Sequence, residues 1–172
     1  ALIEQHVTVT TKHGKCPAFA ACPDAPGRFP GIIFYMDAPG FREELCNMAR
    51  RIAKHGYFCL LPDMYYRNGV LRVEFSMDRD NVFKLVMATM ATLDVARVMR
   101  DTQGMIDYLD GHPKARSPYG CVGYCMSGQY VVAAAGTYPD KIVATASLYG
   151  VGIVTDNPDS PHLLAPNITG EL

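Results

Sequence analysis

Hydrophobic and polar positions follow two different rhythms along the chain, and each rhythm predicts its own kind of element. Residues 5–12 alternate in part and are rich in Val and Thr, which favours a β-strand. Residues 13–15 include a glycine and can turn the chain into a second short strand near Phe19–Cys22. This first part of the sequence therefore predicts an antiparallel hairpin.

Beyond residue 30 the pattern changes to short, continuous apolar runs separated by longer segments with helical periodicity. Continuous runs are typical of parallel strands that are covered on both faces. The runs are residues 31–35, 57–61 and 142–148. Apolar residues recur every three or four positions in the segments 42–55 and 81–109, and an alanine-rich run after residue 128 ends near Tyr138. The pattern leaves open whether 81–109 is one helix or two helices broken near Thr92–Asp94.

Strands that alternate with helices imply right-handed crossovers and a mostly parallel sheet. The expected fold class is therefore α/β, with a mostly parallel sheet preceded by the N-terminal antiparallel hairpin. With 172 residues, of which 49% are hydrophobic and 19% charged, the chain is long enough for one globular domain, residues 1–172. No repeat or low-complexity segment divides it.

Charge and cysteine content narrow the possible functions. A net charge of −1 gives no reason to expect nucleic acid or an anionic membrane as a partner. No apolar run approaches the roughly 20 residues of a bilayer-spanning helix, and the first residues lack the pattern of a signal peptide. The six cysteines form no C-x-x-C pair and no zinc-type spacing with the five histidines. We therefore expect reduced thiols in a cytoplasmic protein with no metal and no cofactor.

The segment Gly120–Gly128 carries the candidate chemistry. A β-forming stretch runs into a cysteine between small residues, and a helical run follows at once. This is the layout of a nucleophile elbow, with Cys125 where serine is commoner. The tight turn requires small residues two positions before and after the nucleophile, and Gly123 and Ser127 meet that requirement. A helix N-terminus beside the sulfur favours the thiolate, which is the attacking form.

Other residues near this turn compete for the same interpretation. Ser127 is a rival nucleophile that fits the motif less well, because Cys125 rather than a glycine lies two positions before it. Free cysteines in apolar strands are usually inert core residues. We expect Cys59 and Cys121 to be of that kind.

Several motifs, each at the end of a predicted strand or helix, together resemble the dienelactone hydrolase (carboxymethylenebutenolidase-type) family. The likeness covers roughly residues 5–155, nearly the whole chain. The motifs are Met36-Asp37-Ala38-Pro39-Gly40, Leu61-Pro62-Asp63-Met64-Tyr65, Gly123-Tyr124-Cys125-Met126-Ser127-Gly128, Tyr138-Pro139-Asp140-Lys141 and Ser147-Leu148-Tyr149-Gly150.

The resemblance implies an α/β-hydrolase fold and hydrolysis of a small ester or lactone through a thioester intermediate. It places the nucleophile at Cys125 and an oxyanion hole at the backbone N–H groups of Met126 and Ala38. The family's acidic residue beside the nucleophile falls on Asp37. That carboxylate either helps to set the protonation of the cysteine or holds the loop that follows it through an Asx-type turn.

The resemblance also suggests which side chains bind substrate. Family substrates carry a carboxylate, for which an arginine is the natural partner. Arg79 lies where the family places such an arginine, and Arg67 and Arg72 are nearby alternatives. Tyr65 and Tyr149 are candidate pocket walls.

Hydrolysis by a cysteine nucleophile also needs a base that takes and returns the proton, and an acidic residue that orients this base. The family carries its acid after one more strand and its histidine further on, so both are expected beyond Leu172, and the 172 residues are expected to be C-terminally incomplete and catalytically poor alone. A triad built from Asp156 or Asp159 with His162 is a weaker alternative, because that segment has the composition of an exposed loop.

Two other classes of function compete with a hydrolase. A non-catalytic thiol protein could use Cys125 to sense oxidants or bind a ligand without any histidine. Nucleotide binding is disfavoured, because the glycines around the elbow do not have the G-x-G-x-x-G spacing and no phosphate-binding G-x-x-x-x-G-K motif is present.

Overall fold

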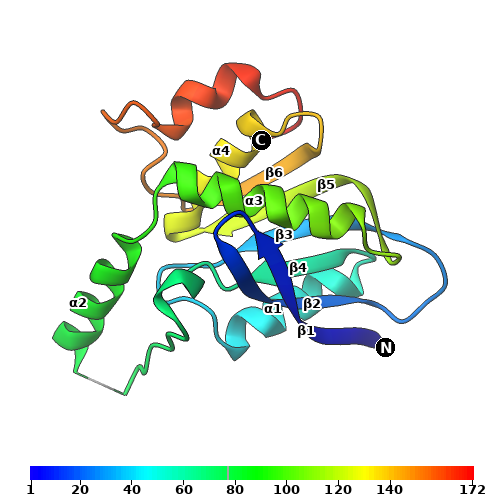
Figure 1. Ribbon diagram of the computed structural model, residues 1–172, viewed down its shortest axis with the longest axis horizontal. Coiled ribbons are helices and arrows are strands. Elements are labelled where there is room, and N and C mark those ends of the chain that lie inside the picture. The colour runs from blue at the N-terminus through cyan, green and yellow to red at the C-terminus, as the bar shows by residue number, and fades with distance from the viewer. Residues whose placement is uncertain (77) are drawn as a thin grey trace.

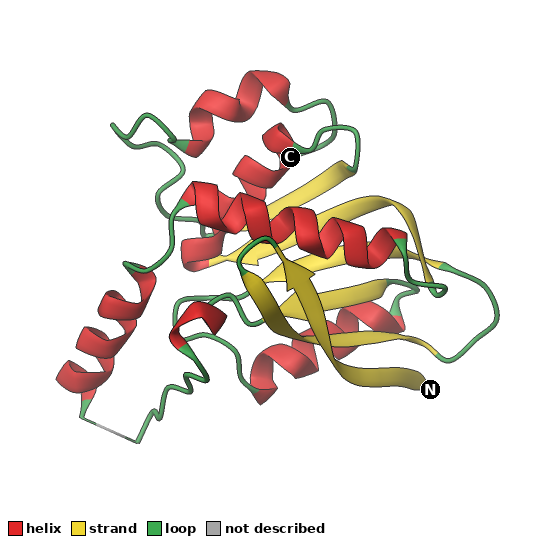
Figure 2. Ribbon diagram, in the orientation of Figure 1, coloured by secondary structure: helices red, strands yellow, loops and turns green. Residues whose placement is uncertain are grey.

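The computed structural model describes residues 1–76 and 78–172. In this part of the chain one six-stranded sheet is flanked by helices on both faces (Figures 1 and 2). Its strands are β1 (Leu2–Thr11), β2 (Gly14–Pro23), β3 (Phe29–Tyr35), β4 (Phe58–Pro62), β5 (Ala115–Tyr124) and β6 (Ile142–Leu148). Its helices are α1 (Glu43–Lys54), α2 (Arg79–Met90), α3 (Val95–Asp110) and α4 (Gly128–Thr137), with short 3-10 turns η1 (Tyr66–Asn68), η2 (Cys125–Ser127) and η3 (Pro161–Asn167).

The strand order is β1-β2-β4-β3-β5-β6. The pairs β1–β2 and β2–β4 are antiparallel, whereas β4–β3, β3–β5 and β5–β6 are parallel. The expected mostly parallel sheet with an N-terminal antiparallel hairpin is thus confirmed. The hairpin strands are longer than predicted, because backbone pairing runs without interruption from Leu2 opposite Pro23 to Thr11 opposite Gly14 and includes exposed positions that add nothing to the apolar pattern.

The helices divide between the two faces of the sheet. Helix α1 packs on β2 and β4, and α3 and α4 pack on the opposite face, across β1, β5 and β6 (Figure 1). The segment 81–109 contains two helices. The side chain of Asp94 accepts the backbone N–H of Arg97 at 2.7 Å and caps α3, so the chain breaks between α2 and α3.

The expectation of an exposed loop over residues 156–162 is wrong in part. Pro161 opens the 3-10 turn η3, which packs against α4. Proline is compatible with a first helical position because its missing N–H would have no partner there. The expected next strand also pairs slightly earlier than predicted, since Glu171 forms a parallel bridge with Ala144 of β6.

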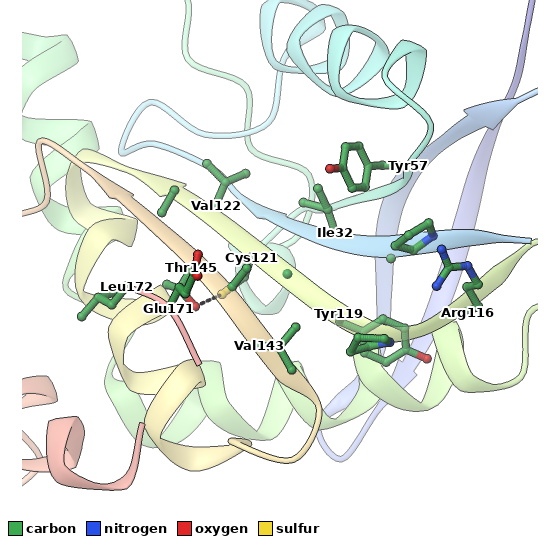
Figure 3. Close-up of a pocket in the computed structure, with 16 residues that line it drawn as sticks. Ile32, Tyr57, Arg116, Tyr119, Cys121, Val122, Val143, Thr145, Glu171 and Leu172 are labelled. Carbon is green, nitrogen blue, oxygen red and sulfur yellow. Dashed lines mark hydrogen bonds between the residues drawn. The ribbon is translucent and has the colours of Figure 1, made fainter. Parts of the chain in front are cut away.

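One face of the sheet is covered only in part. Helix α1 covers the half formed by β2 and β4, and an apolar trough of about 490 Å³ lies over β3, β5 and β6. Figure 3 shows side chains from these strands lining it, among them Ile32, Val122 and Val143. Cys125 is not among its lining residues. None of the helices in the described residues combines the length and apolar character needed to cross a bilayer.

Candidate active site

Cys125 lies at the sharp turn between β5 and α4. Tyr124 still has extended geometry, with φ −119° and ψ 142°, whereas Cys125 has a φ of 54° and begins the short turn η2 that leads into α4. A positive φ is unfavourable for a residue with a Cβ and persists only where the surrounding structure holds it. Of the six cysteines, Cys125 alone is partly exposed, and the other five are buried. The strand–turn–helix geometry expected around Cys125 is therefore present.

The turn is as tight as the sequence pattern requires. A Cβ added to Gly123 would lie 2.6 Å from the carbonyl oxygen of Ser127. A Cβ added to Gly128 would lie 2.2 Å from the Cα of Gly150. Ser127 itself is fully buried, and its hydroxyl donates to the carbonyl of Met36. A buried, hydrogen-bonded hydroxyl is a poor nucleophile, which disfavours Ser127 as the rival of Cys125.

The two backbone N–H groups expected to form an oxyanion hole, those of Met126 and Ala38, have no hydrogen-bond acceptor among the described residues. Met126 follows Cys125 in η2, and Ala38 lies in the loop that follows β3. Within residues 1–76 and 78–172, no acceptor is hydrogen-bonded to either N–H. Both residues are buried, at 7% exposure for Ala38 and 1% for Met126. An oxyanion hole is built from unpaired backbone N–H donors, so the assignment of these two groups to one stays a prediction.

Asp37 forms a bidentate ion pair with Arg42. Nη1 of Arg42 donates to Oδ1 at 2.6 Å and Nη2 donates to Oδ2 at 2.8 Å, while Nη1 also donates to the carbonyl of Gly40 at 2.9 Å. The hydrogen bonds to Asp37 raise the pKa of Arg42. The pair ties both ends of the loop around Ala38 together, so the geometry favours a loop-holding function for Asp37. Among the described residues the carboxylate makes these contacts with Arg42, and no backbone N–H donates to it as the expected Asx-type turn would require. An effect of Asp37 on Cys125 stays a prediction.

Sequence reasoning missed Arg42. An arginine at the start of an amphipathic helix has the pattern of a surface charge. The signal that could have revealed it is the spacing of five residues from Asp37 across a Pro-Gly turn, which lets a long side chain fold back on the carboxylate.

The arginines expected to bind substrate have different surroundings. Arg67 pairs with Asp101 through two hydrogen bonds of 2.8 and 2.9 Å. Arg72 donates to Asp63 at 3.0 Å and lies over the ring of Phe41. Arg79 is exposed at the start of α2, a helix that stands away from the sheet (Figure 1). Two of the three guanidinium groups are thus already engaged by carboxylates, and substrate binding by Arg79 stays a prediction.

The two tyrosines expected as pocket walls also differ. Tyr149 follows β6 and is 74% exposed, with a φ of 40° and its ring 5.9 Å from that of Tyr124. Tyr65 is only 2% exposed, and its hydroxyl donates to the carbonyl of Ala38 at 2.8 Å. Tyr149 is therefore exposed to solvent at the carboxyl ends of the strands, whereas Tyr65 is buried and holds the loop that contains Ala38.

No histidine in the described part of the chain is hydrogen-bonded to Cys125. Nδ1 of His162 lies 2.6 Å from the hydroxyl of Ser160, and neither Asp156 nor Asp159 contacts that ring by a hydrogen bond. The weaker alternative of a triad built from these residues thus lacks its acid–histidine contact. Among the described residues, no cluster of three or more His, Cys, Asp or Glu could hold a metal ion.

Solved structures resemble this domain. A putative dienelactone hydrolase from Klebsiella pneumoniae matches with a TM-score of 0.83 at 22% sequence identity, over 99% of this chain and 70% of that chain. With the strand order and the elbow, this likeness identifies the domain as an α/β-hydrolase fold.

Sequence comparison identifies the family. The model of the dienelactone hydrolase family matches residues 16–171. A putative carboxymethylenebutenolidase from Methylorubrum extorquens is 30% identical over 129 residues, 74% of this chain and 43% of that protein. A probable 2-oxo-3-(5-oxofuran-2-ylidene)propanoate lactonase from Bradyrhizobium sp. is 30% identical over 135 residues, 78% of this chain and 51% of that protein. The chain belongs to the dienelactone hydrolase family. It spans about half the length of the curated relatives it matches.

Proposed function

We propose that this protein hydrolyses small carboxylic esters or lactones, with Cys125 as the nucleophile and a thioester as the intermediate. The observation that carries the proposal is the backbone of Cys125, whose φ of 54° presents a partly exposed thiol at a strand–helix turn. Family membership supports the reaction class, and the names of two relatives, a carboxymethylenebutenolidase and a lactonase, support the substrate class.

The first chemical step forms the thioester. The Cys125 thiolate attacks the carbonyl carbon, so that a C–S bond forms and the carbonyl electron pair moves to the oxygen. The N–H groups of Ala38 and Met126 bind that negative oxygen, and each such donor contributes about 3 kcal/mol to transition-state stabilisation. When the oxyanion collapses, the C–O bond to the leaving group breaks and the alkoxide leaves. Water then attacks the thioester, which releases the acid and restores the thiol.

The described residues favour the first step over the second. Thiolate attack on an activated ester needs no general acid when the leaving group is stable as an anion, as p-nitrophenolate is. Hydrolysis of a thioester needs an activated water, and no histidine of residues 1–76 and 78–172 is hydrogen-bonded to Cys125 to provide the base. We therefore expect this chain to be acylated rapidly and deacylated slowly.

Reaction with p-nitrophenyl acetate tests the proposed function. We expect a burst of one equivalent of p-nitrophenolate per chain, with the acetyl group on the peptide that contains Cys125. Burial raises the pKa of Cys46 to about 11 and that of Cys121 to about 12, so these thiols should remain unmodified. The absence of a burst, or acetylation of another residue, would contradict the proposal. Oxidation of Cys125 by hydrogen peroxide without any acylation would instead favour a thiol sensor.

Substitutions in the Asp37–Arg42 pair distinguish the two functions considered for Asp37. If the pair holds the Ala38 loop, Asp37→Asn and Arg42→Gln should each slow acylation, by about 10-fold, because a donor misplaced by a fraction of an ångström loses much of its value. Both variants should react with iodoacetamide at the unsubstituted rate, because alkylation creates no oxyanion. A change in alkylation rate in Asp37→Asn alone would show that the carboxylate acts on the thiol instead.

A further inference from the structure

Tyr65 is placed by a buried turn at the end of β4. The carboxylate of Asp63, which is 2% exposed, accepts the backbone N–H of Tyr65 at Oδ1 and a hydrogen bond from Arg72 at Oδ2. The backbone N–H of Asp63 donates to the carbonyl of Pro17 in β2 at 2.8 Å. The turn that carries Tyr65 is therefore fixed to the sheet on one side and to the Asp63 side chain on the other.

The hydroxyl of Tyr65 lies between the two segments that carry the proposed oxyanion donors. It donates to the carbonyl of Ala38 at 2.8 Å and lies 3.2 Å from Sδ of Met126. The edge of the ring packs on Gly40, where an added Cβ would lie 3.2 Å from two ring carbons. One side chain thus contacts both residues of the proposed oxyanion hole and the glycine that ends the Ala38 loop.

The carbonyl of Ala38 precedes Pro39, which has no N–H and cannot help to fix this peptide through a hydrogen bond of its own. On the other side of Ala38, the carbonyl of Asp37 accepts the N–H of Gly40 at 3.1 Å. In a trans peptide the N–H points opposite to the carbonyl, so this bond directs the N–H of Ala38 away from the loop. The Tyr65 hydroxyl and the Gly40 N–H together fix both peptide planes that flank Ala38.

We propose that Tyr65 is a positioning residue for the oxyanion hole, whose hydroxyl holds the Ala38 loop and the Met126 turn in register. This inference rests on the proposed function, since it states that Tyr65 contributes to the rate at which Cys125 is acylated. Burial raises the pKa of the Tyr65 phenol, so the hydroxyl keeps its proton and remains a donor throughout the neutral range. The effect should appear in the transition state, where the oxygen carries charge, more than in the binding of neutral ester.

Tyr65→Phe removes the hydroxyl and keeps the ring that packs on Gly40. We expect acylation by p-nitrophenyl acetate at saturating ester to slow by about 10-fold, with little change in the concentration for half-saturation, because donor alignment rather than ester binding is lost. The rate of alkylation by iodoacetamide should stay as in the unsubstituted protein. A purely structural effect of the substitution would lower both rates or neither.

Tyr66→Phe is the matched control. The hydroxyl of Tyr66 is also hydrogen-bonded, to Thr11 at 2.7 Å and to Asp101 at 2.8 Å, but it does not contact the elbow or the Ala38 loop. Tyr66→Phe should lower the melting temperature of the protein without lowering the ratio of the acylation rate to the alkylation rate. An unchanged ratio in Tyr65→Phe, or an equal fall in both variants, would overturn the inference. Failure of the unsubstituted protein to acylate at Cys125 would instead overturn the proposed function.

Discussion

Cys125→Ala should abolish the burst of p-nitrophenolate, leaving only the rate of hydrolysis in buffer. In the proposed reaction the sulfur of Cys125 forms the new bond, and the five other cysteines are buried. Burial disfavours the charged form of each of those thiols and keeps ester away from it. The measurement is stopped-flow absorbance of p-nitrophenolate, together with the intact mass of the protein after the reaction.

Cys121→Ala is the matched control for this prediction. Cys121 is in β5, four residues before Cys125; it is 4% exposed, and its thiol contacts the hydroxyl of Thr145 rather than the elbow. The burst should remain at one equivalent in this variant. A burst that survives in Cys125→Ala would move the nucleophile elsewhere, with Ser127 as the first residue to examine. Cys125→Ser should acylate far more slowly than the unsubstituted protein, because a serine hydroxyl needs a base that a thiolate does not.

The elements and the elbow could be predicted from the sequence because their causes are local. Continuous apolar runs gave the central strands, and β4 begins one residue from the predicted start, at Phe58. The elbow followed from the small residues that surround Cys125, since only a glycine fits where the added Cβ of Gly123 would meet Ser127. These constraints act between residues only a few positions apart, so they can be recognised from the residue types in the sequence.

The polar contacts that shape the site could not be predicted in the same way. The bond from Tyr65 to the carbonyl of Ala38 spans 27 residues, and the bond from Ser127 to Met36 spans 91. Each depends on where two loops meet after the sheet has formed, and no periodicity in the sequence records that meeting. The pairing of Asp37 with Arg42 is closer in sequence, but it requires the loop to fold back on itself. Sequence therefore pointed to the candidate nucleophile, and the structure was needed to reveal which contacts hold the loops around it.

Gly128→Ala should destabilise the protein although alanine is the better helix former. Gly128 has helical geometry, with φ −57° and ψ −34°, so the backbone would accept alanine and gain up to about 1 kcal/mol of helix propensity. The new Cβ, however, would lie 2.2 Å from the Cα of Gly150 and 2.6 Å from the hydroxyl oxygen of Ser147. Backbone cannot rotate away as a side chain can, and overpacking typically costs about 1–3 kcal/mol, with more expected for a backbone clash.

The steric cost should therefore exceed the gain, with a net loss of about 2 kcal/mol in the free energy of unfolding and a fall in melting temperature of roughly 4–8 °C. Urea denaturation and thermal melting measure both. Gly111→Ala is the control, because its Cβ would lie 3.5 Å from the nearest atom and its φ of −89° suits alanine. That variant should be as stable as the unsubstituted protein or slightly more stable.

Gly128→Ala should also slow acylation, because the turn after β6 is hydrogen-bonded to Cys125, the proposed nucleophile. The N–H of Val151 donates to the carbonyl of Cys125 at 3.0 Å, so a displaced Gly150 would pull on the residue that holds the thiol. We expect Gly128→Ala to acylate more slowly than Gly111→Ala at a temperature where both are folded. Equal acylation rates in the two variants would mean that the elbow keeps its geometry without this turn, and that its strain is held by β5 and α4 alone.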